Sequence, residues 1–279
     1  MPVRAVTFDA DDTLWDFQEV SLSATRLLVE RVSELHPGHG GTVEDLLQAR
    51  IDVGRSSPDG TSYALIRRMA IQQFVDTHVG GPDPDLVDHL TELFFTHRDT
   101  AVRPFPDVEP MLERLPNDLV LGVITNGNTT WKAMSIADRF QFWLAADQTG
   151  IRKPDPRLFR MAAAAAGCRP REMVHVGDEP HSDVVGARRA GVRSVWINRS
   201  GATGTEAEPD AEIDSMAELP ELLARWDQEE KSGVGVGPHP RPWPDDQRLD
   251  PRLLAEGDRR NVVDRFRYWK REAIVEELD

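Results

Sequence analysis

The sequence predicts an α/β protein built on a doubly wound parallel sheet, and three observations carry this prediction. Short apolar runs rich in β-branched residues alternate with helical patterns after about residue 100. The connections between them are short, as in sheets whose parallel strands are joined by helical crossovers. Several runs end in acidic or hydroxyl side chains, and the carboxyl ends of parallel strands are where such sheets place their chemistry.

The first predicted strand is Val3–Phe8, an apolar run followed at once by Asp9, Asp11 and Asp12. If the backbone stays extended, Asp9 and Asp11 start on the same side of the strand. Two carboxylates that close repel each other, and a hard divalent cation such as Mg2+ would relieve the repulsion and usually brings a substrate phosphate. On this stretch alone, an acidic turn in which Asp12 or Thr13 caps a helix explains the pattern equally well.

The next stretch, 17–101, has a helical pattern throughout. Breakers and N-caps such as Asp83 followed by Pro84 divide it into four predicted helices. These helices cover 21–35, 42–51, 61–74 and 83–94. They predict a small helical bundle inserted after the first strand of the sheet.

The remaining elements continue the alternation of strand and helix. Strands are predicted over 119–124, 142–145, 173–176, 192–197 and 211–214. Helices are predicted over 107–115, 129–140, 158–166, 182–190 and 218–226. Together with the first strand, this order predicts a Rossmann-like core over 1–16 and 102–228, with the helical bundle at 17–101 as an insert.

Composition argues against several classes of partner. The formal net charge of -15 and the pI near 5.0 disfavour a nucleic-acid or anionic-membrane surface, because both partners are polyanions. Cys168 is the only cysteine, so no intrachain disulfide is expected, and Asp9 comes too early to leave room for a removable signal peptide. No apolar run reaches membrane-spanning length. We therefore expect a cytoplasmic protein, a possible homodimer, that binds neither nucleic acid nor membrane.

Residues 229–279 are predicted to form a glycine- and proline-rich linker followed by an amphipathic helix capped by Asn261. From about Trp243 on, this extension is similar to the opening residues of a SpoU-type RNA methyltransferase. The part that would bind S-adenosylmethionine is absent, so the similarity implies no activity. The extension carries more acidic than basic residues, which favours a docking or dimerising helix, or a fusion remnant, over RNA binding.

Four short motifs occur in a characteristic order along the chain. They are Asp9-x-Asp11-x-Thr13, a strand ending in Thr125-Asn126-Gly127, Lys153-Pro154, and Gly177-Asp178 followed by Asp183. In this order they resemble the four motifs of the haloacid dehalogenase-like (HAD) superfamily of phosphohydrolases, over roughly Val3 to Leu223. The resemblance implies that the helical bundle is a type-1 cap, which covers the active site and selects the leaving group.

The resemblance also implies the catalytic roles. Asp9 corresponds to the nucleophile, which forms an aspartyl-phosphate intermediate. Asp11 corresponds to the general acid, which protonates the leaving oxygen and then activates water. The implied function is a Mg2+-dependent phosphomonoester hydrolase acting on a small phosphorylated metabolite.

Phosphate and metal binding are assigned in the same way. Thr125, Asn126 and Lys153 would bind the phosphate, with the backbone N–H groups of the turn after Thr125 as an anion site. The metal would be held by Asp9, the backbone carbonyl of Asp11 and Asp178, and Asp183 would support these ligands. Each residue also has a plain structural interpretation: Thr125 as a strand-end hydroxyl, Lys153 as a solvated loop lysine, and Asp183 as a helix cap.

Three alternatives share part of this set of residues. A haloacid dehalogenase keeps the nucleophile but lacks an acid at the position of Asp11, because halide leaves without a proton. A response-regulator receiver is far shorter and has no helical insert after its first acids. A non-catalytic phosphate-binding module is disfavoured by the presence of Asp9, Asp11, Lys153 and Asp178 together.

Overall fold

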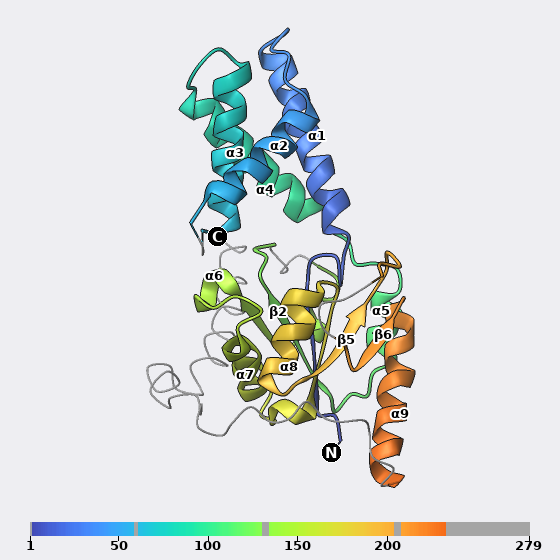
Figure 1. Ribbon diagram of the computed structural model, residues 1–279. Helices are drawn as coiled ribbons and strands as arrows, with labels where there is room; N and C mark the ends of the chain where they lie inside the picture. Colours follow the sequence, from blue (N-terminus) through green and yellow to red (C-terminus); the bar gives the residue numbers. More distant parts are fainter. Residues whose placement is uncertain (1, 59–60, 130–133, 204–207, 233–279) are drawn as a thin grey trace, which may run out of the picture. The chain divides into compact units, whose positions relative to one another are not determined.

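The computed structural model describes residues 2–58, 61–129, 134–203 and 208–232 (Figure 1). The chain forms two compact units, which we describe separately. The α/β unit comprises Met1–Leu14, Pro104–Asn126 and the described residues from Ser135 on, and the helical unit comprises Trp15–Arg103 and Gly127–Met134. No helix in the described ranges is long and apolar enough to cross a membrane.

The α/β unit is organised around one six-stranded sheet in which every strand pair is parallel (Figure 1). Its strands are β1 (Ala5–Phe8), β2 (Val120–Thr125), β3 (Phe142–Ala145), β4 (Met173–Gly177), β5 (Arg193–Ile197) and β6 (Ala211–Ile213). Their order is β3-β2-β1-β4-β5-β6, so the chain winds one way from β1 to β3 and the other way from β4 to β6. The predicted doubly wound parallel sheet is confirmed, and its switch point lies between β1 and β4.

β1 lies at the centre of the sheet and is buried along its whole length. Strands covered by helices on both faces are apolar without alternation, which is why Ala5–Phe8 could be recognised in the sequence. The polar exception in β1 is Thr7, which pairs in register with Gly122 of β2 and His175 of β4. Thr7 and His175 are both fully buried, so each needs a polar partner inside the core.

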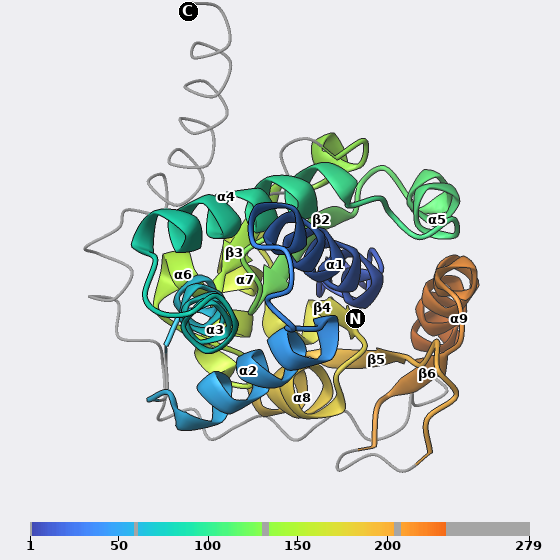
Figure 2. The same ribbon diagram turned by 90° about the horizontal axis from the view of Figure 1, so that it is seen from above.

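Helices cover both faces of the sheet: α7 and α8 lie on one face, and α5 and α9 on the other (Figures 1 and 2). The helices of this unit are α5 (Val108–Arg114), α6 (Ala146–Thr149), α7 (Pro156–Ala165), α8 (Gly186–Ala190) and α9 (Leu219–Ser232). The short turns are η1 (Ala137–Arg139), η2 (Pro170–Glu172), the π-helical η3 (Pro180–Val185) and η4 (Met216–Glu218). α7 starts at Pro156, two residues before the predicted range 158–166, because Asp155 caps it by accepting the Arg157 N–H at 2.9 Å and proline suits the first helical position.

In the α/β unit, the helices predicted over 129–140 and 182–190 differ most from the structure. In the described part of 129–140, Met134–Ile136 are not helical, and Ala137–Arg139 forms only the 3-10 turn η1. Tertiary contacts override the local pattern here, because the Arg139 guanidinium bonds the Leu112 carbonyl and the Gln141 N–H already pairs with Leu121 of β2 at 2.9 Å. The helix predicted over 182–190 begins earlier, at Pro180, and its first part is the π-helical turn η3.

The helical unit contains α1 (Phe17–Leu35), α2 (Val43–Ser56), α3 (Tyr63–His78) and α4 (Pro84–Ala101). α1 starts four residues earlier than predicted because Asp16 caps it, accepting the Glu19 N–H at 2.8 Å. α2 starts at a capping box formed by Thr42 and Asp45. The core of this unit is formed by apolar residues such as Leu28, Val32, Ile71, Phe74, Leu90 and Phe94.

The described residues Gly127–Thr129 group with the helical unit by their contacts, although they lie within the predicted core range 102–228. Arg98 of α4 explains the difference, because its guanidinium donates to Asn128 Oδ1 at 2.8 Å and to the Asn128 carbonyl at 3.1 Å. The Arg98 side chain is almost fully buried, so these bonds are shielded from water.

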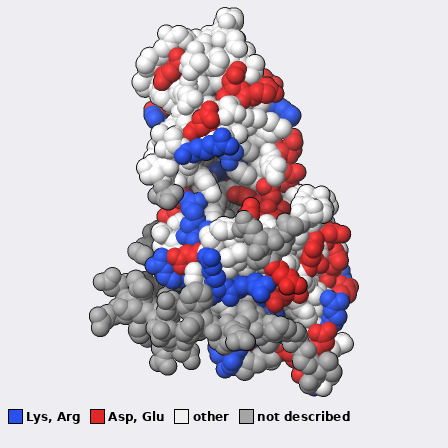
Figure 3. Space-filling view, in the orientation of Figure 1, with Lys and Arg blue, Asp and Glu red and all other residues white. Residues whose placement is uncertain are grey.

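The acidic character of the chain is visible at its surface. Figure 3 shows acidic side chains on the part of the α/β unit that carries β6 and α9. At the carboxyl end, α9 runs as far as Ser232. The rest of the predicted extension, including the segment from Trp243 that resembles a methyltransferase, lies outside the described residues.

Candidate active site

Asp9 stands at the carboxyl end of the central strand. Its N–H donates to the Val176 carbonyl of β4 at 2.8 Å, which continues the β1–β4 ladder one residue past Phe8. Asp9 as a whole residue is only 8% exposed. The switch point of the sheet therefore holds a carboxylate, as expected for the ligand-binding edge of an open α/β sheet.

Lys153 is the positive charge beside Asp9. Its Nζ donates to Asp9 Oδ1 and, at 2.7 Å, to Asp183 Oδ1. Burial alone would lower the pKa of Lys153, but the carboxylates of Asp183 and Asp9 raise it above the usual value. Lys153 is 3% exposed, so its interpretation as a solvated loop lysine is wrong.

Asn126 holds the backbone of Lys153 in place. Its side chain donates from Nδ2 to the Lys153 carbonyl at 3.0 Å and accepts the Lys153 N–H on Oδ1 at 2.8 Å. Both hydrogen bonds join the turn after β2 to the loop before α7. The Asn126 side chain therefore fixes the backbone of Lys153 relative to the turn after β2.

The segment after β4 supplies two more carboxylates. Asp178 Oδ1 accepts the Thr13 hydroxyl at 2.9 Å, which ties the turn after β1 to the end of β4. Asp183 lies in η3, a π-helical turn, a type of distortion that is frequent at functional sites. Its carboxylate packs against Gly177, where a Cβ would lie only 2.2 Å from Asp183 Cγ. Gly177 is therefore required for Asp183 to approach the strand end.

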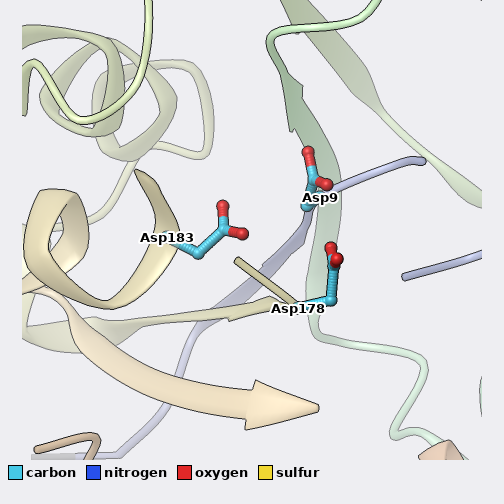
Figure 4. Close-up of side chains that lie close together, drawn as sticks. All are labelled: Asp9, Asp178 and Asp183. Atoms are coloured by element: carbon cyan, nitrogen blue, oxygen red, sulfur yellow. The ribbon is translucent and has the colours of Figure 1, made fainter. Parts of the chain in front are cut away.

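Asp9, Asp178 and Asp183 bring carboxylate oxygens within 4.8 Å of one another, from β1, β4 and η3 (Figure 4). Burial raises the pKa of Asp9 well above its usual value, although Lys153 partly offsets it. Burial and the charge of Asp183 raise the pKa of Asp178 to about 7. Asp9 and Asp183 are buried and Asp178 is half-buried, and Lys153 donates to two of the three carboxylates. This set of carboxylate oxygens fits a hard divalent cation.

Asp183 differs from the other two acids because its oxygens already have donors. Oδ1 accepts from Lys153 Nζ and from His175 Nε2 at 3.0 Å, and Oδ2 accepts the Glu179 N–H at 3.0 Å. Burial alone would raise the pKa of Asp183, but Lys153 and His175 bring it down to about 2. An ionised carboxylate offers about four lone-pair sites, and three are used here. Asp9 and Asp178 are therefore better placed than Asp183 to bind a metal directly.

Asp11 and Thr125 occupy different surroundings. The Leu14 N–H donates to the Ala10 carbonyl at 2.8 Å, and Asp12 has a φ of 61°, so the chain turns here and the extended backbone assumed for Asp9 and Asp11 ends. The half-buried Asp11 carboxylate is not in the three-acid cluster. Thr125 closes β2, opposite Ala145 of β3, and is 3% exposed.

The sequence motifs assigned no role to His175, which lies inside β4. Its contact with Asp183 depends on the π-helical turn that brings residue 183 back over the strand. The signal available in the sequence was a histidine within an otherwise apolar strand, a position where a buried polar side chain needs a partner.

Comparison with known proteins places the chain in a family. Residues 3–191 match the family model described as haloacid dehalogenase-like hydrolase. A phosphoserine phosphatase of Thermus thermophilus is 38% identical over 146 residues, which are 50% of this chain and 58% of that relative. A glyceraldehyde 3-phosphate phosphatase of Methanopyrus kandleri is 29% identical over 236 residues, 79% of this chain and 97% of that relative.

A solved structure described as a 2-haloacid dehalogenase from Pseudomonas syringae pv. Tomato is 38% identical, with a TM-score of 0.68. The match covers 80% of this chain and 99% of that one. The carboxylates at the ends of β1 and β4, the buried lysine and the match to the family model agree: this chain belongs to the haloacid dehalogenase-like hydrolase family.

Proposed function

We propose that this chain is a HAD-like phosphatase, a Mg2+-dependent phosphomonoester hydrolase that acts on a small phosphorylated metabolite through an aspartyl-phosphate intermediate. The observation that carries the proposal is the pairing at the end of the central strand, where the Asp9 carboxylate is buried against Lys153 with Asp178 beside it. The relatives named as phosphatases support the same chemistry.

Asp9 is the proposed nucleophile. One of its carboxylate oxygens attacks phosphorus in line, the ester P–O bond breaks, and the phosphoryl group becomes bonded to Asp9. Lys153 offsets negative charge on Asp9 and on the phosphoryl oxygens. A Mg2+ ion bound by Asp9, Asp178 and the backbone carbonyl of Asp11 would supply further charge compensation at those oxygens.

Asp11 is the proposed general acid and base. It gives its proton to the departing alkoxide oxygen, and the resulting carboxylate takes a proton from the water that hydrolyses the acyl phosphate. The half-buried Asp11 carboxylate is not part of the Asp9, Asp178 and Asp183 cluster, which suits a group that transfers protons rather than one whose carboxylate binds the metal. Asp11 then ends the cycle protonated, as it began.

The phosphate would be held by Thr125, Asn126 and Lys153. Thr125 supplies a hydroxyl at the end of β2, and the N–H of Asn126 lies in the turn that follows. The bonds from the Asn126 side chain to the Lys153 backbone fix the two segments together. Such prior fixation lowers the reorganisation needed when the phosphoryl group binds.

Dehalogenation is a second candidate because a 38% identical structure is described as a 2-haloacid dehalogenase. Asp11 argues against it here, since halide departs without a proton and needs no acid at that position. The competing chemistries are separable by product: phosphate from an ester or halide from a haloacid.

The experiment is a hydrolysis screen with Mg2+ that includes the esters named for the relatives, such as phosphoserine and glyceraldehyde 3-phosphate, together with a 2-haloacid. We expect phosphate release that stops in a chelator. Asp9→Asn keeps the shape of the side chain but removes the nucleophile, and should be slower by at least about a thousandfold, roughly 4 kcal/mol.

Asp118→Asn is the matched control, because Asp118 is exposed in the loop before β2, and it should leave the rate unchanged. Halide release faster than phosphate release would establish the dehalogenase instead. Binding of inorganic phosphate without turnover of any ester would indicate a non-catalytic phosphate-binding module.

A further inference from the structure

A row of buried polar side chains leads from the middle of the sheet to the candidate active site. Thr7 of β1 and His175 of β4 are register partners, and Thr7 Oγ1 lies 3.0 Å from His175 Nδ1. On the other side of the ring, His175 Nε2 lies 3.0 Å from Asp183 Oδ1, the same oxygen that accepts from Lys153. Hydrogen bonds thus connect the core to the lysine beside Asp9.

The direction of these hydrogen bonds follows from the charges. Lys153 and His175 outweigh burial and bring the pKa of Asp183 to about 2, so its carboxylate is ionised and can only accept. His175 Nε2 must therefore carry the hydrogen. Burial lowers the pKa of His175, so the ring is neutral and its Nδ1 carries no hydrogen. The Thr7 hydroxyl oxygen lies 3.0 Å from Nδ1 and 3.3 Å from the Val174 carbonyl, so its hydrogen has two acceptors within reach.

Packing holds the ring in this position. His175 has no exposed surface, and Phe159 of α7 meets it edge to face at 4.9 Å with an interplanar angle of 86°. The second oxygen of Asp183 is held independently by the Glu179 N–H. The ring and the carboxylate therefore restrict each other's orientation.

We propose that His175 is a positioning residue of the active site: its Nε2–H donates to Asp183 Oδ1 and so holds that carboxylate, and through it Lys153, in place beside Asp9. This inference rests on the proposed phosphatase function. His175 itself touches neither Asp9 nor the place where a phosphoryl group would bond to it, and acts only through Asp183.

A neutral donor suits this position better than the alternatives. A lysine or arginine would add a second positive charge and compete with Lys153 for the charge of Asp183. An apolar side chain would leave Oδ1 with one donor fewer and free the carboxylate to rotate. A neutral histidine donates a hydrogen bond to Asp183 Oδ1 without adding a positive charge, so the charge of Asp183 still interacts in full with Lys153.

The test compares two substitutions that differ in one property. His175→Leu fills the space without a donor, whereas His175→Gln keeps a neutral N–H donor at a similar reach. We expect kcat to fall by at least about tenfold in His175→Leu with little change in KM, because Lys153 loses its fixed geometry, and to stay within about threefold of wild type in His175→Gln.

Ser194→Ala is the matched control. Ser194 pairs in register with His175 on the neighbouring strand β5, but its hydroxyl bonds Asp210 at 3.2 Å rather than Asp183. This variant should keep the wild-type kcat. A wild-type rate in His175→Leu, or equal losses in the Leu and Gln variants at unchanged melting temperature, would overturn the proposal.

A second measurement needs no variant. Nitrogen-15 NMR of the full chain should show His175 protonated on Nε2 and unprotonated on Nδ1 across the active pH range. The opposite tautomer would overturn the proposal even if the variants failed to fold. Loss of activity in Asp9→Asn is a separate outcome, so the proposed function and the role of His175 can fail independently.

Discussion

At the scale of single residues, substitutions of Asp9 and Asp11, the two aspartates that follow β1, are expected to impair catalysis in different ways. Asp11→Asn leaves the nucleophile but removes proton transfer, commonly a loss of about a hundred- to ten-thousandfold. The loss should be small for p-nitrophenyl phosphate, whose leaving group needs little protonation, and large for a sugar or aliphatic ester. Rapid mixing with the nitrophenyl ester should show a burst in the Asp11 variant and none in Asp9→Asn. Equal defects with both esters and no burst would mean that Asp11 is not the acid.

Gly177 provides a second prediction at this scale. A Cβ at this position would lie 2.2 Å from Asp183 Cγ and 2.4 Å from Asp183 Oδ2, so Gly177→Ala must displace the carboxylate that holds Lys153. We expect kcat to fall by about a hundredfold, as for other displacements near 1 Å in a catalytic site. Steady-state kinetics check this. Wild-type kcat in the variant would show that the position of Asp183 is not critical.

At the scale of secondary-structure elements, the same Gly→Ala change should have opposite effects at two sites. Gly54 is exposed within α2, and the nearest atom to an added Cβ is Ile66 Cγ2 at 4.0 Å. Gly122 of β2 pairs with Phe142 of β3, whose ring would lie 2.2 Å from the new Cβ. Gly54→Ala should stabilise by about 0.5–1 kcal/mol through helix propensity, whereas Gly122→Ala should destabilise by about 1–3 kcal/mol through overpacking.

Urea unfolding followed by circular dichroism measures both effects. The paired design controls for the chemistry of the substitution, since both variants add one methyl group to the chain. A stable Gly122→Ala protein would mean that the Phe142 ring can move away without cost.

The turn before β4 carries a pH-dependent contribution to stability. Glu172 accepts the Arg169 N–H at 2.8 Å and the Arg169 guanidinium at 2.9 Å, and these hydrogen bonds lower the pKa of Glu172 to about 2. Because the pKa of Glu172 is lower in the folded than in the unfolded chain, its ionised carboxylate stabilises the fold at pH values above the unfolded pKa near 4.5. This contribution to the free energy of unfolding is lost as the pH falls toward about 2. The Glu172→Gln variant lacks this titration.

The expected difference in unfolding free energy between wild type and Glu172→Gln is therefore largest above pH 4.5 and shrinks as the pH falls. Urea unfolding of both proteins across this range measures it. A difference that stayed constant with pH would show that Glu172 is not stabilised as a carboxylate by Arg169.

At the scale of the whole molecule, the residues after α9 are expected to be dispensable for catalysis. All site residues, from Asp9 to Asp183, precede Ser232, and the family match ends at residue 191. Truncation after residue 232 should leave kcat and most of the thermal stability unchanged. Calorimetry and ester hydrolysis on the full and shortened chains measure this. A large fall in melting temperature would show that the extension packs on the rest of the protein.

The sequence alone determined the elements whose signals are local. The apolar run at Ala5–Phe8, the alternation that follows 101 and the N-caps of the inserted helices all depend on neighbouring residues, so the sheet and most helices could be predicted. Because acids directly follow two of the strands, the placement of Asp9 and Asp178 at one edge followed from the order of the motifs. The helix predicted over 129–140 failed where contacts to α5 and β2 overrode the local pattern.

The tertiary structure decided how those residues work together. The Asn126 side chain bonds the backbone of Lys153, 27 positions away in the sequence, and Lys153 bonds Asp9, which is 144 positions away. Sequence periodicity carries no information about contacts at such separations. The same holds for His175, which meets Asp183 only because a π-helical turn folds back over Gly177. Patterns in a sequence indicate which face of a helix or strand is buried. Hydrogen-bond partners from distant elements are determined only when those elements pack together, so the folded structure is needed to identify them.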